Sequence, residues 1–204
     1  YEDFLESRCL PRSRDKVKLE LKELDIPFYD PYLIVKKRRG EWQKEYNQMT
    51  IRRANENDIP RLLELLEQVL QIHADIRPDI FIPGTTKYTN EELTQMIKDD
   101  TKPIYVAADE NDNCLGYAFC QLQEQPFSNN MVPFTSLFID DLCVDASTRG
   151  QHIGEKLFVH VKEEAKRLGC YEVTLNVWAG NTSAEKFYEK MGLKTKEQQM
   201  EYIL

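Results

Sequence analysis

The sequence lacks the common glycine-rich patterns for phosphate binding. None of its eight glycines falls into G-x-G-x-x-G or G-x-x-x-x-G-K-[ST], which argues against a dinucleotide-binding fold and against a nucleoside triphosphatase. No apolar run approaches the ~18 residues that a membrane-spanning helix needs, and no charged n-region with an apolar h-region opens the chain. We therefore expect a protein without a membrane partner.

Cysteine is scarce and shows no C-x-x-C pair. The cysteines are odd in number: Cys9, Cys114, Cys120, Cys143 and Cys170. Cys120 and Cys143 lie within apolar, strand-like runs, where a reduced and buried thiol is the expected state. The pattern predicts a cytoplasmic protein, and we expect no metal site.

Positive charge is in deficit over most of the chain, whose formal net charge is −8. Residues 1–48 hold 11 of the 27 Lys and Arg residues and 10 of the 35 Asp and Glu residues, so the rest carries a net charge of −9. An acidic body argues against nucleic acid as a partner and favours cationic small molecules.

Residues 49–204 contain a regular succession of apolar patterns. Alternating apolar residues predict strands, and apolar residues at helical spacing predict helices, with capping boxes at Thr89-x-x-Glu92 and Thr182-x-x-Glu185. We expect strands over 49–54, 103–108, 115–122, 136–144, 173–177 and 197–204, and helices over 59–73, 90–98, 153–168 and 182–191. This β-α-α-β-β-β-α-β-α-β order predicts an α/β fold with a central mixed sheet flanked by helices.

Residues 1–48 form an N-terminal extension to which the sequence assigns no role. Residues 16–24 could form a charged helix, and residues 33–35 could form a strand or a docking patch. The basic cluster at residues 36–39 is interpreted as a solvated linker face, not as a nucleic-acid contact.

The most informative stretch is a strand, a tight turn and a helix start over residues 142–157. The first N–H groups of a helix lack intrahelical partners and lie at its positive dipole end, which suits a phosphate. Arg149 adds a cation, while Gly150 and Gly154 allow backbone to approach a ligand. The alternative is an ordinary strand-to-helix turn.

Two motifs give residues 49–204 a resemblance to the GNAT superfamily of acetyl-CoA-dependent N-acetyltransferases. The first is the pyrophosphate loop Arg-x-x-Gly-x-Gly/Ala at residues 149–154, and the second is Asn-x-x-Ala-x-x-Phe-Tyr at residues 181–188. His152 departs from the pattern, because the family usually has Gly there. We expect His152 to open a right-handed helix, a conformation that His adopts readily.

The resemblance implies acetyl-CoA as cosubstrate and a set of residues that bind it. The pantetheine arm is expected along the strand, and the pyrophosphate on the turn and the helix start. The implied residues are Leu142, Cys143, Val144, Arg149, Gly150, Gln151, His152, Ile153, Gly154, Glu155, Asn176 and Asn181.

The resemblance also implies direct attack of a free amine on the thioester. Tyr188 matches the usual acid that protonates the leaving thiolate. For the base we expect Asp140 or Asp141, which we place at the start of one strand with side chains on opposite faces. A pair of solvated strand-end carboxylates is the equally open alternative.

The acceptor amine is not named by the sequence. The family frames this site with the first two helices and their connection, which makes four residues candidates: His73, Asp79, Phe81 and Tyr88. We expect an N-acetyltransferase for a primary amine of a small molecule. The alternative is a catalytically silent acyl-CoA-binding module, and a homodimer remains open.

Overall fold

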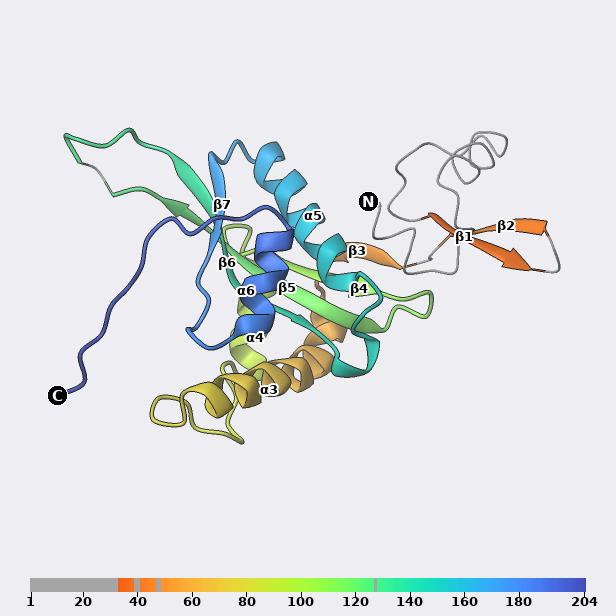
Figure 1. Cartoon of the computed structure of the whole chain (residues 1–204), viewed down its shortest axis with the longest axis horizontal. Coiled ribbons are helices and arrows are strands. Elements are labelled where there is room, and N and C mark those ends of the chain that lie inside the picture. Colours follow the sequence, from red (N-terminus) through yellow and green to blue (C-terminus); the bar gives the residue numbers. More distant parts are fainter. Residues whose placement is uncertain (1–32, 39–40, 47–48, 127) are drawn as a thin grey trace. The chain divides into compact units, whose positions relative to one another are not determined.

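The computed structural model describes residues 33–38, 41–46, 49–126 and 128–204. The chain divides into two units, residues 1–48 and 49–204. In the first unit, β1 (Leu33–Arg38) pairs antiparallel with β2 (Glu41–Tyr46) (Figure 1). The expected strand at residues 33–35 lies within β1, whereas the expected helix at residues 16–24 lies outside the described residues.

The second unit is built on a five-stranded sheet of order β3-β4-β5-β6-β7. Its strands are β3 (Thr50–Arg53), β4 (Ile104–Ala108), β5 (Cys114–Glu124), β6 (Thr135–Val144) and β7 (Glu172–Leu175). Neighbouring strands are antiparallel except β6 and β7, which are parallel because α5 crosses between them. The predicted mixed α/β fold is confirmed.

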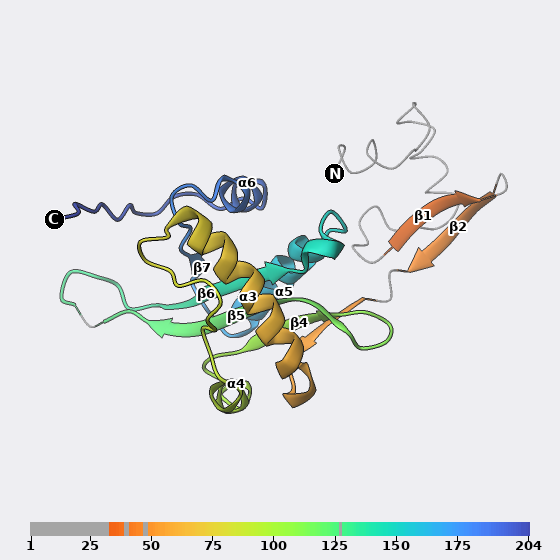
Figure 2. The same ribbon diagram turned by 90° about the horizontal axis from the view of Figure 1, so that it is seen from below.

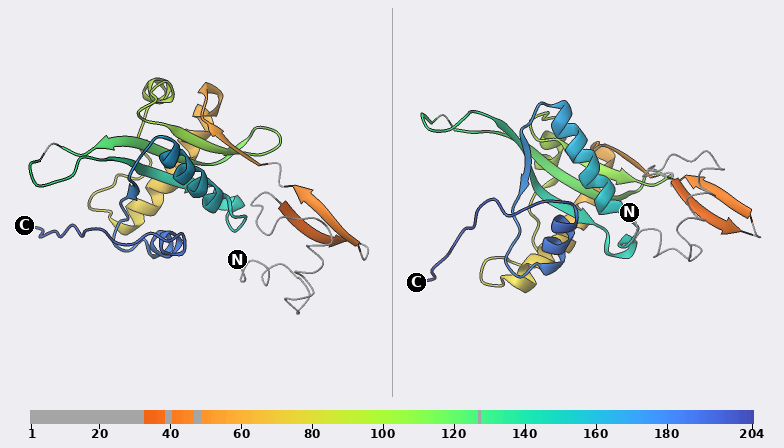
Figure 3. Two further views of the ribbon diagram at one scale, coloured as in Figure 1. Left: turned by 90° about the horizontal axis from the view of Figure 1, so that it is seen from above. Right: turned by 45° about the horizontal axis from the view of Figure 1, so that its top comes forward.

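Helices cover both faces of this sheet (Figures 2 and 3). One face carries α3 (Ile59–Ile76) and α4 (Asn90–Ile97), and the other carries α5 (Ile153–Arg167) and α6 (Thr182–Lys190). The side chain and backbone of Thr89 cap α4 together with Glu92, as the sequence predicts. Asn181, not Thr182, caps α6, because its Oδ1 accepts a hydrogen bond from the Ala184 N–H.

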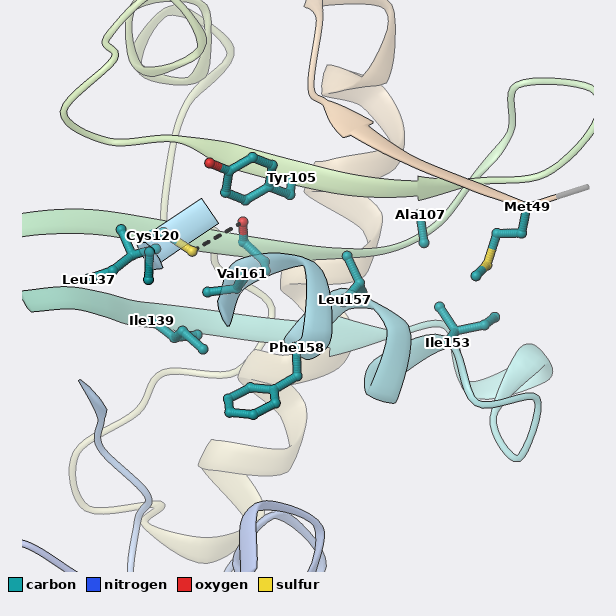
Figure 4. Packing of buried hydrophobic residues seen from close by; sticks show 12 residues of the cluster. Met49, Tyr105, Ala107, Cys120, Leu137, Ile139, Ile153, Leu157, Phe158 and Val161 are labelled. Carbon is teal, nitrogen blue, oxygen red and sulfur yellow. Dashed lines mark hydrogen bonds between the residues drawn. The ribbon is translucent and has the colours of Figure 1, made fainter. Parts of the chain in front are cut away.

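The sheet separates two hydrophobic clusters. On the α5 face, Leu157 and Val161 are fully buried against Leu137 and Ile139 of β6 (Figure 4). On the α3 face, the cluster is made by residues including Leu62, Leu65, Leu93, Val106, Tyr117 and Phe119. The two sets alternate along β4 and β5, so the period-2 pattern of the sequence fixes which face each residue joins.

The buried cysteines agree with their predicted state. Cys114, Cys120 and Cys143 are free and buried, and Cys170 is partly buried. Burial raises the pKa of Cys120 to about 12, and the Arg53 charge only partly opposes this effect. A thiol with such a pKa is protonated at neutral pH, so these cysteines are packing residues, not nucleophiles.

The structure differs from the sequence prediction in one missing strand and one strand boundary. The expected strand at residues 197–204 is absent, and Met200, Tyr202 and Leu204 are exposed. A strand requires a ladder partner, and no strand among the described residues pairs with this segment. In addition, β7 ends at Leu175 instead of continuing through Val177.

Candidate active site

The sheet opens between β6 and β7, and this opening positions the candidate site. The two strands pair only from Ser136 opposite Glu172 to Ile139 opposite Leu175. β6 continues to Val144, so no described strand pairs with residues 140–144 on the β7 side. Backbone N–H and C=O groups on this free edge suit an extended ligand that binds like an added strand.

A β-bulge lies at the start of the opening. Across the β5–β6 ladder, Asp141 opposes Phe119 and Ile139 opposes Cys120, which leaves Asp140 as the extra residue. Residues that oppose each other share a face, so Asp141 joins Phe119 on the α3 side. The expectation that Asp140 and Asp141 start a strand and point to opposite faces is therefore wrong.

The first carboxylate, Asp140, is held by two residues of the loop before α4. Its Oδ2 accepts hydrogen bonds from Lys87 Nζ at 2.8 Å and from the Tyr88 hydroxyl at 3.1 Å. The Tyr88 ring stacks on Phe119, with ring centroids 5.7 Å apart. The stacking fixes Tyr88, and with it the loop, over the bulge.

The second carboxylate, Asp141, accepts a hydrogen bond from the Tyr117 hydroxyl at 3.2 Å. Burial raises the pKa of Asp141 to about 6, while the Lys87 ammonium lowers it and the Asp140 charge raises it. Burial also raises the pKa of Tyr117 well above its usual value, so its hydroxyl stays a donor. A carboxyl group that titrates near neutrality suits proton transfer.

Tyr188 lies on α6 and is partly buried. Its ring centroid is 5.0 Å from that of Phe187 and 6.2 Å from that of Phe158. Burial raises its pKa above the usual value, and the Asp141 charge adds to the effect. The raised pKa keeps the Tyr188 hydroxyl protonated at neutral pH. No hydrogen bond joins this hydroxyl to any described residue, so its proton is available to a ligand.

The turn before α5 has the features of an anion site. α5 begins at Ile153 without a side-chain cap, so no cap covers the N–H groups of its first turn. Arg149 is exposed beside them, and its Nε donates a hydrogen bond to the Val144 carbonyl at 3.3 Å. The exposed Gly150 and Gln151 complete the turn.

His152 adopts a left-handed conformation with a φ of 60°, so the expected right-handed conformation is wrong. The turn also needs a positive φ at Gly150, which is 78°. A residue with a side chain adopts this left-handed conformation only with backbone strain, whereas glycine adopts it freely. The glycine that the family usually has at this position would therefore avoid the strain that His152 carries. His152 Nδ1 lies 2.9 Å from Glu155 Oε1, an interaction that stabilises the strained turn.

Gly154 lies where β6, α5 and α6 meet. A Cβ atom there would lie 3.4 Å from Phe187 Cζ and 3.5 Å from Val144 Cγ2, which are ordinary van der Waals distances, so the packing does not demand glycine. Glu155 joins the same helices by a 2.8 Å ion pair with Lys190. The cofactor candidates on β6, the turn and α6 are thereby brought together at one end of the sheet.

The two candidate asparagines differ in their roles. Asn181 uses its Oδ1 to cap α6. Asn176 is exposed directly after β7, beside the opening in the sheet. Both residues lie on the segment that leads from β7 to α6.

The four acceptor candidates fall into two groups. Tyr88 lies at the bulge, as described, whereas His73, Asp79 and Phe81 lie at the end of α3. Phe81 contacts His73 and Trp178, with ring centroids 5.1 and 5.2 Å apart. Asp79 accepts hydrogen bonds from Arg77, whose guanidinium also lies 5.9 Å from the Trp178 ring centroid.

Sequence reasoning missed Lys87, Tyr117 and Trp178. Their roles depend on the path of the loop before α4 and on cross-strand partners, neither of which has a local sequence pattern. Among the described residues, no group of three or more His, Cys, Asp or Glu side chains could hold a metal ion. The described helices are also too short or too polar to cross a membrane.

Comparison with known proteins identifies the family. The Acetyltransferase (GNAT) family profile matches residues 66–193, which include the bulge, the turn and α6. The chain belongs to this family. The matched range supports the resemblance given by the two motifs.

Individual relatives match stretches of different lengths. The chain is 37% identical over 62 residues to glucosamine 6-phosphate N-acetyltransferase of Arabidopsis thaliana, which is 30% of this chain and 40% of that protein. It is 31% identical over 105 residues to the peptidyl-lysine N-acetyltransferase YjaB of Salmonella typhimurium, covering 50% and 59% of the two chains. A mutant of the BH1408 protein of Bacillus halodurans has a TM-score of 0.73 and 27% identity, covering 76% of this chain and 99% of that chain.

Proposed function

We propose that residues 49–204 are an acetyl-CoA-dependent N-acetyltransferase that acts on a primary amine of a small molecule. The observation that carries the proposal is the bulge in β6. It brings Asp140 and Asp141 to one face at the point where the edge of β6 becomes free. A base and an acyl donor are needed at the same place, and this arrangement puts two carboxylates beside an edge that suits the donor.

Three parts of the site suit acetyl-CoA. The free edge at Leu142, Cys143 and Val144 suits the amide groups of the pantetheine arm. The uncapped start of α5 with Arg149 suits the pyrophosphate. Asn176 and Asn181 lie on the segment that would border the arm on its other side.

The acceptor ammonium would bind at the carboxylates. Asp140 pairs with the ammonium group of Lys87, and this ion pair supports the proposal that the carboxylate binds an acceptor ammonium. Asp140 or Asp141 removes the proton, directly or through a water, and the neutral amine attacks the thioester carbonyl. Tyr188 then donates its proton to the departing thiolate.

The proposed substrate class, a primary amine, rests on the names of the relatives and on the negative charge of residues 49–204. Glucosamine 6-phosphate and peptidyl-lysine, named in two relatives, both present a primary amine. The acidic body of the chain favours cationic acceptors. Three buried free thiols favour a reducing compartment, and we propose the cytoplasm.

A thiol-release assay tests the function. Acetyl-CoA is incubated with the full chain and, in turn, with spermidine, glucosamine 6-phosphate and a lysine-containing peptide. We expect amine-dependent release of CoA thiol, which falls by roughly 10²-fold or more in Asp140→Asn or Asp141→Asn. Glu163→Gln, on the exposed face of α5, is the control. Binding of acetyl-CoA without release for any amine would favour the silent binding module.

A further inference from the structure

The chain places one of its own primary amines at the proposed acceptor site. Lys87 Nζ lies 2.8 Å from Asp140 Oδ2 and 5.4 Å from the centroid of the Tyr88 ring. These are the contacts expected of an acceptor ammonium: a carboxylate that takes its proton and an aromatic face that binds its charge. The carboxylate is that of Asp140, the bulge residue next to the free edge of β6, and the aromatic face is that of Tyr88.

The position of Lys87 is fixed by its neighbours on both sides. Tyr88 donates a hydrogen bond to the same Asp140 oxygen and stacks on Phe119. Thr89 caps α4, which anchors the loop one residue further on. The Lys87 side chain is 42% exposed, so it is held at the carboxylate while remaining open to a second ligand.

We propose that Lys87 is an acetylation site, modified by the protein's own acetyl-CoA at this carboxylate. The proposal rests on the proposed function, because acetyl-CoA supplies the acetyl group. It adds to that function a covalent product within the chain itself. An acetylated Lys87 carries no positive charge, so Asp140 would become free to bind the ammonium group of an external acceptor.

The step balances without a further reactant. The Lys87 ammonium gives one proton to Asp140, which passes it to water. The neutral nitrogen attacks the thioester carbonyl carbon, a C–N bond forms, and the C–S bond breaks. The nitrogen loses a second proton as the amide forms, and the departing thiolate gains one, from Tyr188 or water, to give CoA thiol. The products are Nε-acetyl-lysine, CoA and one proton released to water.

Titratable groups face Lys87 from several elements. They are Asp140 and Asp141 on β6, Tyr88 on the loop and His73 on α3, and Asp141 in turn accepts a hydrogen bond from Tyr117 on β5. Burial lowers the pKa of Lys87, but the hydrogen bond and charge of Asp140 outweigh it, so the pKa is raised above its usual value. The neutral amine is therefore scarce at neutral pH, and acetylation should become faster as the pH rises.

Mass spectrometry tests the proposal on the full chain. The protein is incubated with acetyl-CoA that carries a deuterated acetyl group, with no other amine, and labelled lysines are mapped by peptide analysis. Lys166 is the matched control, because its Nζ also lies 2.8 Å from a carboxylate, Glu163, and it is 67% exposed. We expect label at Lys87 at least about tenfold faster than at Lys166, with a rate constant independent of protein concentration.

The variants separate the possible outcomes. Asp140→Asn should slow labelling of Lys87 by roughly 10²-fold or more and leave Lys166 unchanged. Labelling of Lys87 no faster than of Lys166, or at an unchanged rate in Asp140→Asn, would overturn the proposal. If external amines are acetylated but Lys87 is not, only this inference fails. If neither is acetylated while acetyl-CoA binds, the proposed function fails as well.

Discussion

Asp140 and Asp141 are consecutive in the chain and yet lie on the same face of the sheet, because a bulge inserts Asp140 between two paired positions. The two carboxylates differ in their surroundings. Asp140 is exposed and faces an ammonium and a phenol, whereas Asp141 is partly buried and faces the Tyr117 hydroxyl. A carboxylate that pairs with an ammonium, next to a carboxyl group with a raised pKa, is suited to receiving a proton and passing it on.

The partly buried Asp141 should make stability depend on pH. Its pKa of about 6 in the folded protein exceeds the ordinary value of 3.8, so the stabilising effect of the protonated form is complete below pH 4 and is lost as the pH rises through 6. Asp141→Asn should therefore increase the free energy of unfolding at pH 8 by about 1–3 kcal/mol relative to its effect at pH 4. Urea unfolding at both pH values measures this difference. An equal effect at both would contradict the raised pKa.

Tyr188 should contribute to catalysis through its hydroxyl group and not through its ring. Tyr188→Phe retains the ring that packs against Phe158 and Phe187, so the fold and the affinity for acetyl-CoA should be unchanged within a few fold. Loss of the acid should lower kcat by about 10²–10⁴. Steady-state kinetics and calorimetry measure the two effects. Tyr171→Phe, at an exposed tyrosine, is the control, and an unchanged kcat would reduce Tyr188 to a packing residue.

The turn before α5 should determine cofactor affinity. Arg149→Ala removes a cation beside the uncapped helix start, and Gly154→Asp adds a negative charge to its first turn. Each should weaken acetyl-CoA binding by about 1–3 kcal/mol in calorimetry. Arg167→Ala, at the opposite end of α5, should leave the affinity unchanged. Unchanged affinities in both turn variants would place the pyrophosphate elsewhere.

The left-handed conformation of His152 should be measurable as strain. His152→Gly and His152→Ala both remove the interaction with Glu155, but only glycine adopts a φ of 60° without cost. The Gly variant should be more stable than the Ala variant by about 1–2 kcal/mol in urea unfolding. Equal stabilities would show that the turn relaxes to a negative φ when the imidazole is lost.

The N-terminal extension should be dispensable for the second unit. A chain that begins at Gln48 keeps Met49, which is buried in the α5-side cluster. It should melt cooperatively and bind acetyl-CoA with the affinity of the full chain. Calorimetry and thermal unfolding check this, and loss of a cooperative transition would mean that residues 1–48 complete the core.

Local sequence patterns predicted an element correctly where its formation depends only on residues within that element. The capping box at Thr89 and the apolar spacing of α5 depend on residues within a single helix, and both were predicted correctly. The absent strand at residues 197–204 shows the limit. Its apolar residues suit a strand, but strand formation depends on a partner that the segment itself does not encode.

The site was harder to predict than the fold for the same physical reason. A bulge exists only in the register between two strands, so the sequence of β6 predicted alternation where Asp140 and Asp141 share a face. The contact between Lys87 and Asp140 joins residues 53 positions apart through a loop without regular structure. The turn before α5, in contrast, is one continuous segment, and its position between β6 and α5 was predicted directly from the sequence.

The helix that starts at this turn also forms the centre of one hydrophobic cluster. Ile153 lies in the first turn of α5, and Leu157 and Val161 follow it into the core on one side of the sheet. Unfolding of this core therefore also destroys the binding site for any ligand that the first turn holds. Occupancy by acetyl-CoA at 100 times its Kd would add about 2.7 kcal/mol to the free energy of unfolding. Loss of the bound cosubstrate would therefore lower the stability of the core on this side of the sheet and make the chain more open to proteolysis.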